Sequence, residues 1–223
     1  MSRKKVRVSK KGSDFQSKNK LIDHASSSFW LYKFIPLSLL SILTTIFYWP
    51  SLKYPFQFDD LANITKKFAI RFDNPLARWW CNSRWMGDWL NVINYQIGQF
   101  NPFYYRVFNL IIHLATGLTL FYLILNLCKF LKSKPFFYNN ATLIAFTTSI
   151  LFLLHPVQTQ TVSYVIQGRL EGLATLFVIT TLFLFVKTFS VKNKIFKPFL
   201  LVATIVVALL SCGTKEIVVV TPF

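Results

Sequence analysis

The chain has 223 residues, of which 53% are hydrophobic and 17% aromatic, and its formal net charge is +17. A mean hydropathy of +0.44 and only seven glycines are typical of a polytopic membrane protein and argue against a soluble globular enzyme. Apolar runs of about twenty residues are long enough to cross a hydrocarbon core about 30 Å thick, and in lipid such runs must be helical. The sequence therefore predicts an all-α polytopic membrane protein.

The positive charge is distributed beside the apolar runs. Eight of the 25 basic residues lie within residues 1–20, and further lysines cluster at 129–134 and 187–197. Basic clusters that flank spans set the topology and attract anionic lipid. A nucleic-acid-binding surface would need them together on one soluble face. We therefore expect membrane lipid and no nucleic acid among the partners, and a cytoplasmic N-terminus.

The predicted elements follow in chain order. Residues 1–28 are polar and basic, and we expect a disordered cytoplasmic tail there, followed by a membrane domain over 29–223. The predicted spans lie at about 29–49, 104–131, 136–155, 170–189 and 195–213, and a sixth span starts from 217. The longest segment between spans is an outer loop, 50–103.

The outer loop combines acidic residues with apolar helical patterns. Four of the eight acids lie in it: Asp59, Asp60, Asp73 and Asp88. Apolar residues recur at spacings of three and four over 85–97, including Trp85, Trp89, Ile93 and Ile97. A Trp-rich amphipathic helix of this kind is expected to lie in the membrane interface. A shorter stripe of the same spacing follows the aspartate pair, at Leu61, Ile64 and Phe68.

The adjacent Asp59 and Asp60 are the first candidates for chemistry. Asp60 is placed to act as the N-cap of a helix that begins at Leu61, with Asp59 directly before it. A carboxylate at a helix N-terminus is held ionised by the dipole and the free N–H groups, which suits a general base or a metal ligand. A capping role and a functional role are compatible.

Further ionisable residues are expected on the same outer face. His155 ends the third span, Arg169 and Glu171 open the fourth, and Lys215 and Glu216 form a corner before the last apolar run. Each has a structural alternative: Arg169 as an interfacial anchor, Glu171 as a first-turn acid and the Lys-Glu pair as a solvated corner.

Three polar residues inside the second span are at membrane depth: Asn109, His113 and Asn126. They are therefore expected to face other helices. For His113, a buried and hydrogen-bonded structural role is favoured over a role as a ligand.

Several motifs, in this order along the chain, carry a resemblance to a known family. They are "FDD…N", "NPFYYRVFNLIIHLATG", "LFLLHPVQTQTVSYVIQGRLEGLATLF" and "GTKE…P". Together they resemble the GT-C membrane glycosyltransferases, especially the N-terminal membrane region of the transmembrane and tetratricopeptide-repeat (TMTC) O-mannosyltransferases and their bacterial relatives. The resemblance covers about Phe58 to Pro222. It implies a GT-C-like helical bundle with interfacial helices in the first outer loop.

The resemblance also implies an activity. The family's usual donor is a lipid-linked sugar, a polyprenyl- or dolichyl-phosphate hexose, and the sugar is moved on the periplasmic or lumenal side, commonly to a protein hydroxyl. The bacterial inner membrane and the endoplasmic reticulum both fit this topology. A glycan acceptor is the alternative to a protein.

Site residues follow from matching the motifs. The family's acidic motif falls on Asp59 and Asp60, which we assign to catalysis, Asp59 as the base and Asp60 as the group that orients the acceptor or a divalent metal. Its His-Pro, Arg and Lys-Glu elements fall on His155 and Pro156, on Arg169, and on Lys215 and Glu216. Of these, Arg169, Lys215 and His155 are the candidates for binding the donor phosphate.

One position departs from the family pattern. Where family members usually carry Glu, "HPVQTQ" has Gln160, which leaves metal dependence and full activity open. Because GT-C enzymes have more spans, we expect a truncated chain whose fold a partner subunit could complete. An inactive GT-C-like scaffold and, less favoured, a transporter subunit are the alternative functions. A transporter predicts more ionisable residues at mid-span and paired, interrupted spans, which the sequence does not show.

Overall fold

The computed structural model describes residues 34–66, 83–216 and 218. The expected tail at 1–28, Phe68 and Asp73 within 67–82, and the expected sixth span at 217 and 219–223 lie outside the described residues. The chain divides into two compact units, 1–39 and 40–223. In the first unit, residues 34–39 are helical. The contacts given below all belong to the second unit.

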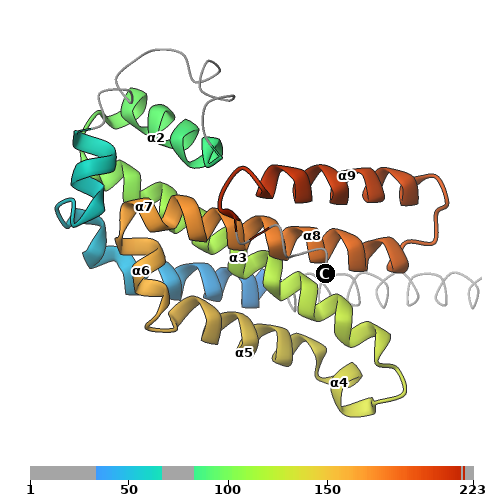
Figure 1. Cartoon of the computed structure of the whole chain (residues 1–223). Helices are drawn as coiled ribbons and strands as arrows, with labels where there is room; N and C mark the ends of the chain where they lie inside the picture. The colour runs from blue at the N-terminus through green and yellow to red at the C-terminus, as the bar shows by residue number, and fades with distance from the viewer. Residues whose placement is uncertain (1–33, 67–82, 217, 219–223) are drawn as a thin grey trace, which may run out of the picture. The chain divides into compact units, whose positions relative to one another are not determined.

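The described residues form helices and turns and contain no strand (Figure 1). The short elements of the outer loop are a 3₁₀ helix, η1 (Trp49–Lys53), a π-helical turn, η2 (Leu61–Thr65), and the helix α2 (Trp85–Gly98). The remaining elements are α3 (Pro102–Phe130), α4 (Pro135–Asn139), α5 (Ala141–Leu154), α6 (Gln158–Ser163), α7 (Val165–Gln167), the π-helical turn η5 (Gly168–Gly172), α8 (Leu173–Ser190) and α9 (Phe196–Ser211).

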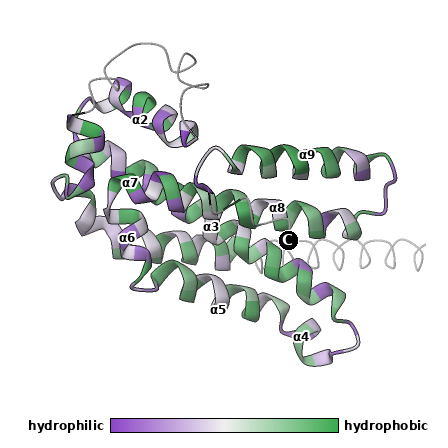
Figure 2. Ribbon diagram, in the orientation of Figure 1, coloured by the Kyte–Doolittle hydropathy of each residue, from purple (hydrophilic) through white to green (hydrophobic). Residues whose placement is uncertain are grey.

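Three of the described helices are long and apolar enough to cross a membrane: Phe34–Lys53, Pro102–Phe130 and Val165–Ser190. The third joins α7, η5 and α8 into one helix, and α5 and α9 are shorter apolar helices. Hydrophobic residues predominate over the length of α5, α8 and α9, as Figure 2 shows. The fold class predicted from the sequence, an all-α membrane protein, is confirmed.

The spanning helices pack in a simple order. Helix α3 packs against α5 on one side and α8 on the other, and α8 packs against α9 (Figure 1). Close approach of α3 and α5 depends on Gly117, because a Cβ atom there would lie 2.5 Å from the side chain of Leu153. Small residues at helix crossings are the usual way in which membrane helices come into van der Waals contact.

The short helices α6 and α7 lie at the end where α3 begins, whereas α4 follows the other end of α3 (Figure 1). Ile64 of η2, Tyr105 of α3 and Val165 of α7 are buried together in one apolar cluster. The cluster joins the outer loop to the start of two spanning helices, so residues that are far apart in sequence meet at this end.

Helix α2 buries only part of its expected apolar stripe: Trp85 and Leu90 pack against the buried cluster of Met86, Ile112 and Leu173. Met86 and Val92 are buried, whereas Trp89 and Ile97 are 37% and 55% exposed. The expected apolar stripe is therefore directed away from the bundle over part of its length. This leaves aromatic and aliphatic surface available for the interfacial position that the sequence predicts.

Candidate functional site

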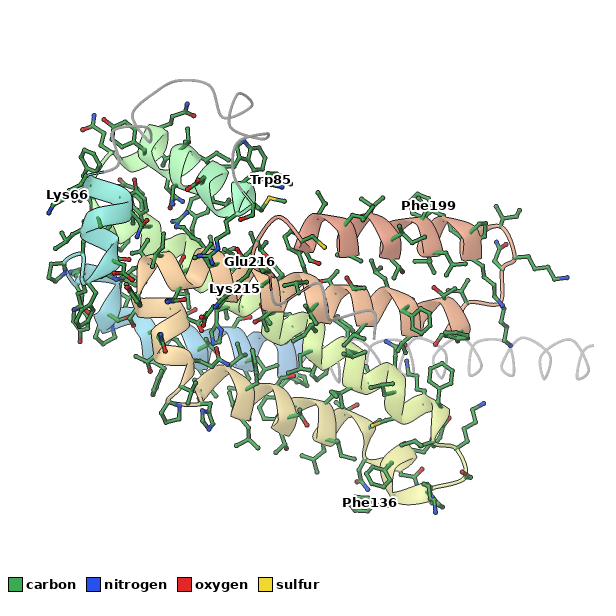
Figure 3. The ribbon with its side chains drawn as sticks, in the orientation of Figure 1. Lys66, Trp85, Phe136, Phe199, Lys215 and Glu216 are labelled. Carbon is green, nitrogen blue, oxygen red and sulfur yellow. The ribbon has the colours of Figure 1, made fainter. Side chains whose placement is uncertain are left out.

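A pocket of about 480 Å³ lies among the outer loop, the start of the Val165–Ser190 helix and the corner after α9. Its charged lining residues are Asp59, Arg84, Asp88 and Glu216, and its amide side chains are Asn63, Asn91 and Gln167. Figure 3 shows Glu216 and Lys215 at the corner, near the end of α2 marked by Trp85. Of the predicted site residues, the pocket lining includes Asp59 but neither Asp60, His155, Arg169 nor Lys215.

Asp59 is exposed at the pocket, and its backbone is fixed on both sides. Its N–H donates to the hydroxyl oxygen of Tyr164 at 3.1 Å, and its carbonyl accepts a hydrogen bond from the amide of Asn63 at 3.0 Å. The Asp59 carboxylate is therefore carried by an anchored segment at the pocket. This geometry suits a group that takes a proton from a bound hydroxyl.

Asp60 is fully buried and occupies the predicted N-cap position of η2, but its side chain makes no capping hydrogen bond there. Its backbone is helical, with φ −56° and ψ −40°, whereas an N-cap that binds the following turn is usually extended. Its carboxylate instead accepts hydrogen bonds from the backbone N–H groups of Ile166 at 2.9 Å and Val165 at 3.3 Å. Asp60 thus caps the helix that carries Arg169.

Arg169 lies behind the pocket. Its side chain is fully buried, its guanidinium carbon is 5.0 Å from the ring centroid of Tyr105, and one nitrogen donates to the Tyr105 carbonyl at 3.3 Å. Two other guanidinium nitrogens, Nε and one Nη, are buried without a hydrogen-bond partner. A Cβ atom on Gly87, a lining residue, would lie 4.0 Å from the Cβ of Arg169. The base of the Arg169 side chain is therefore next to the pocket lining, whereas its guanidinium is buried against Tyr105.

The Lys-Glu corner is fastened by two ion pairs. Lys215 Nζ is 2.6 Å from a carboxylate oxygen of Glu171, so this lysine is directed at the fourth span. Glu216 accepts hydrogen bonds from Arg84 Nε and Nη at 3.0 Å each. The hydrogen bonds from Arg84 lower the pKa of Glu216 below its usual range. The corner therefore brings a carboxylate and a guanidinium, rather than a lysine, to the pocket.

His155 lies in the turn between α5 and α6 and Gln160 lies in the first turn of α6, and both are exposed. The imidazole Nδ1 of His155 accepts a hydrogen bond from the N–H of Val157 at 3.2 Å, which gives it a local role in the turn. Neither residue lines the pocket. The departure from the family pattern at Gln160 therefore removes no carboxylate from the pocket seen here.

Within the second span, His113 is buried and its Nε2 is 2.9 Å from the carbonyl oxygen of Leu153. Asn109 is also buried and donates to the carbonyl of Val165 at 3.1 Å. Both face neighbouring helices, as expected for polar residues at membrane depth.

The sequence reasoning missed two arginines. Arg84 lines the pocket, and Arg106 is fully buried beneath the outer loop. The spacing of Arg106, Asn109 and His113 could have identified the second, because steps of three and four place all three on one face of α3. Arg84 had no comparable pattern, since it precedes α2 in a polar stretch.

A divalent metal does not fit the residues present at the pocket. In the part of the chain that the structure describes, no group of three or more His, Cys, Asp or Glu side chains is placed to hold an ion. Asp60, the sequence-based candidate, has both carboxylate oxygens occupied by backbone N–H groups.

The burial of Asp60 makes a pH-dependent contribution to stability. Burial raises the pKa of its carboxyl group above the usual range, although the N–H groups of Ile166 and Val165 and the charge of Arg106 oppose the shift. The folded protein thus binds this proton more tightly than the unfolded chain, so the contribution is complete at low pH and is lost as pH rises through the folded-state pKa.

We compare the unfolding temperatures of the wild type and Asp60→Asn in detergent from pH 4 to 7. As pH rises, the unfolding temperature of the wild type should fall relative to that of Asp60→Asn. A constant difference across that range would contradict the assignment.

Comparison with curated proteins places the chain beside one named group. It is 27% identical over 200 residues to protein O-mannosyl-transferase TMTC3 of Homo sapiens, covering 82% of this chain and 20% of that protein. It is 30% identical over 173 residues to protein O-mannosyl-transferase F38B6.6 of Caenorhabditis elegans, covering 71% and 24%. For protein O-mannosyl-transferase TMTC1 of Mus musculus the identity is 31% over 156 residues, covering 62% and 15%.

The chain thus spans between 15% and 24% of the length of these relatives. No protein-family model and no solved structure matches it. Most of this membrane chain therefore resembles a region of the TMTC-type proteins, which are named as O-mannosyl-transferases.

Proposed function

We propose that this chain is a membrane glycosyltransferase that moves a hexose from a polyprenyl- or dolichyl-phosphate sugar to a protein hydroxyl. One observation carries the proposal: Asp59 and Arg84 line the same pocket, in a chain similar over most of its length to proteins named O-mannosyl-transferases. We place the pocket on the lumenal or periplasmic face, with the N-terminus in the cytoplasm, because the lysine clusters lie beside the opposite ends of the spans.

The chemistry needs a base and a cation. In the proposed step the Asp59 carboxylate takes the proton of the acceptor hydroxyl, and the hydroxyl oxygen forms a bond to the anomeric carbon. The bond from that carbon to the phosphate oxygen breaks, and the electron pair leaves with the polyprenyl phosphate. A guanidinium that binds phosphate oxygens in two places stabilises the developing charge.

Arg84 is the better candidate for this cation than the residues matched by motif. Its side chain is 44% exposed and lines the pocket, whereas Arg169 is fully buried and Lys215 is paired with Glu171. The donor phosphate would replace Glu216 as the partner of Arg84. An exposed ion pair of this kind is screened by solvent and contributes little to stability, so the exchange is not costly. Arg169 adds positive potential behind the pocket wall.

Transfer by the reconstituted protein tests the proposal. The full chain in lipid vesicles is supplied with radiolabelled polyprenyl-phosphate mannose and a serine- and threonine-containing peptide, and with GDP-mannose in a parallel reaction. Label should enter the peptide from the lipid donor and not from the nucleotide sugar. Absence of transfer from the lipid donor, with protein shown to be inserted, would contradict an independent activity and favour the inactive scaffold.

Replacing Arg84 with Gln is expected to raise the KM for the lipid donor about ten-fold, because one charged contact to phosphate is lost. Lys215→Gln is the matched control, since Lys215 is at the same corner but lines no part of the pocket. Initial rates at varied donor concentration measure both. A larger effect of Lys215→Gln would return the phosphate-binding role to the residue that the motif indicates.

A further inference from the structure

Asp59 and Asp60 are adjacent in sequence but are placed in opposite environments. Asp59 is exposed at the pocket, and Asp60 is fully buried against the helix that begins at Val165. The preceding residue, Phe58, has a φ of +46°, in the left-handed region that a side chain with a bulky ring disfavours. Neighbouring contacts must hold this backbone, because the conformation is unfavourable by itself.

Arg106 holds the loop shortly before Phe58. Its guanidinium is fully buried at the start of α3 and donates to the carbonyl oxygens of Tyr54, Pro55 and Ser163. The bond to Pro55 is 2.6 Å and the bond to Ser163 is 2.7 Å. The Arg106 side chain thus links the loop residues Tyr54 and Pro55 to the end of α6. A planar fork of N–H groups can reach several carbonyls at once, which an ammonium group cannot do with the same geometry.

Asp60 and Tyr164 join the same two segments from the other side. The Asp60 carboxylate accepts hydrogen bonds from the N–H groups of Val165 and Ile166, and it also accepts one from the N–H of Gln57 at 3.4 Å. The Tyr164 hydroxyl accepts the hydrogen bond from the N–H of Asp59. Residues 54–60 and 163–166 are therefore connected by side chains from both segments and from α3.

We propose that Arg106 and Asp60 are positioning residues that together fix the Asp59 carboxylate at the pocket. The proposal rests on the proposed function of Asp59 as the base. It changes the role that the motif implies for Asp60: the second aspartate acts through the backbone of Val165 and Ile166, and it touches neither substrate nor a metal. We call the contacts of Arg106, Asp60 and Tyr164 with residues 54–60 and 163–166 the clasp.

Hydrogen exchange of the full chain in detergent tests the clasp without any substrate. In Arg106→Lys and in Asp60→Asn, the backbone N–H groups of residues 57, 59, 165 and 166 should exchange about ten-fold faster than in the wild type, because their partners are lost or displaced. Asn126→Ala is the matched control: Asn126 is also a buried polar residue of α3, but its amide bonds the carbonyl of Tyr122 within the same helix. Unchanged exchange in both clasp variants would overturn the proposal.

Kinetics distinguish positioning from general stability. With polyprenyl-phosphate mannose, both clasp variants should lose about ten-fold in kcat while the donor KM stays within about two-fold, because a misplaced base slows the chemical step and leaves phosphate binding intact. The double variant should be little worse than the worse single one, since both residues hold the same segment. A loss of kcat equal to that of Asn126→Ala would show a structural effect only and overturn the proposal.

Failure of the proposal and failure of the proposed function give different results. If Asp59→Asn transfers sugar normally, Asp59 is not the base and the positioning role falls with it, whatever the exchange data show. If Asp59→Asn is inactive but the clasp variants keep full kcat despite faster exchange, the base assignment stands and the positioning role is wrong. If Arg106→Lys does not fold, Asp60→Asn carries both measurements.

Discussion

Asp59→Asn is expected to lose sugar transfer by about 10²- to 10⁴-fold while the protein remains inserted and folded. An amide has nearly the shape of the carboxylate but does not accept the proton of the acceptor hydroxyl. The contacts that hold this segment are made by the backbone N–H and carbonyl of Asp59, to Tyr164 and Asn63, and the substitution leaves them in place. Transfer from polyprenyl-phosphate mannose in membranes is the measurement.

Glu171→Gln is the control for this experiment. Glu171 is another acidic residue at the same end of the molecule, but it pairs with Lys215 and is not part of the pocket lining. Its replacement should change transfer by less than about two-fold, because a partly exposed ion pair contributes little. Undiminished transfer by Asp59→Asn, or equal losses in the two variants, would refute the assignment of Asp59 as the base.

Gly168→Ala is expected to destabilise the protein by about 1–3 kcal/mol, even though alanine usually favours a helix. An added Cβ atom would lie 2.2 Å from the side-chain amide of Asn109 and 2.5 Å from the carbonyl oxygen of Thr161. Asn109 is buried and donates to the backbone carbonyl of Val165, so moving it also breaks a buried hydrogen bond. The midpoint of unfolding in detergent measures the effect.

Gly87→Ala provides the matched comparison. Its Cβ atom would meet the end of the Leu170 side chain at 3.0 Å, and that side chain can shift by rotation. We expect a change within about 1 kcal/mol, since helix propensity favours alanine and the contact opposes it. Equal stability of Gly168→Ala and the wild type would mean that α3 and the η5 turn are not as close as the structure places them.

The predicted site was only partly assembled by the fold. The motif placed Asp59, Arg169 and Lys215 on one face, and the structure places all three at the same end, but only Asp59 lines the pocket. Sequence position indicates the end of a helix at which a residue lies, whereas its exposure depends on which neighbours cover it. Arg169 is covered by the packing of Tyr105 and Gly87, neither of which a motif match identifies.

The sequence by itself determined the membrane class and the helical structure of this protein, because long apolar runs have no other way to satisfy their backbone in lipid. It also indicated the end of the bundle where ionisable residues gather. Tertiary structure alone decided that Asp59 faces the pocket and Asp60 is buried. The opposite placement of these two neighbours depends on the backbone angles of Phe58 and on hydrogen-bond partners about 100 positions away. Tertiary structure likewise selected Arg84 for the pocket and decided which carbonyls Arg106 binds, because the spacing along α3 indicates a shared helix face but not the long-range partners of that face.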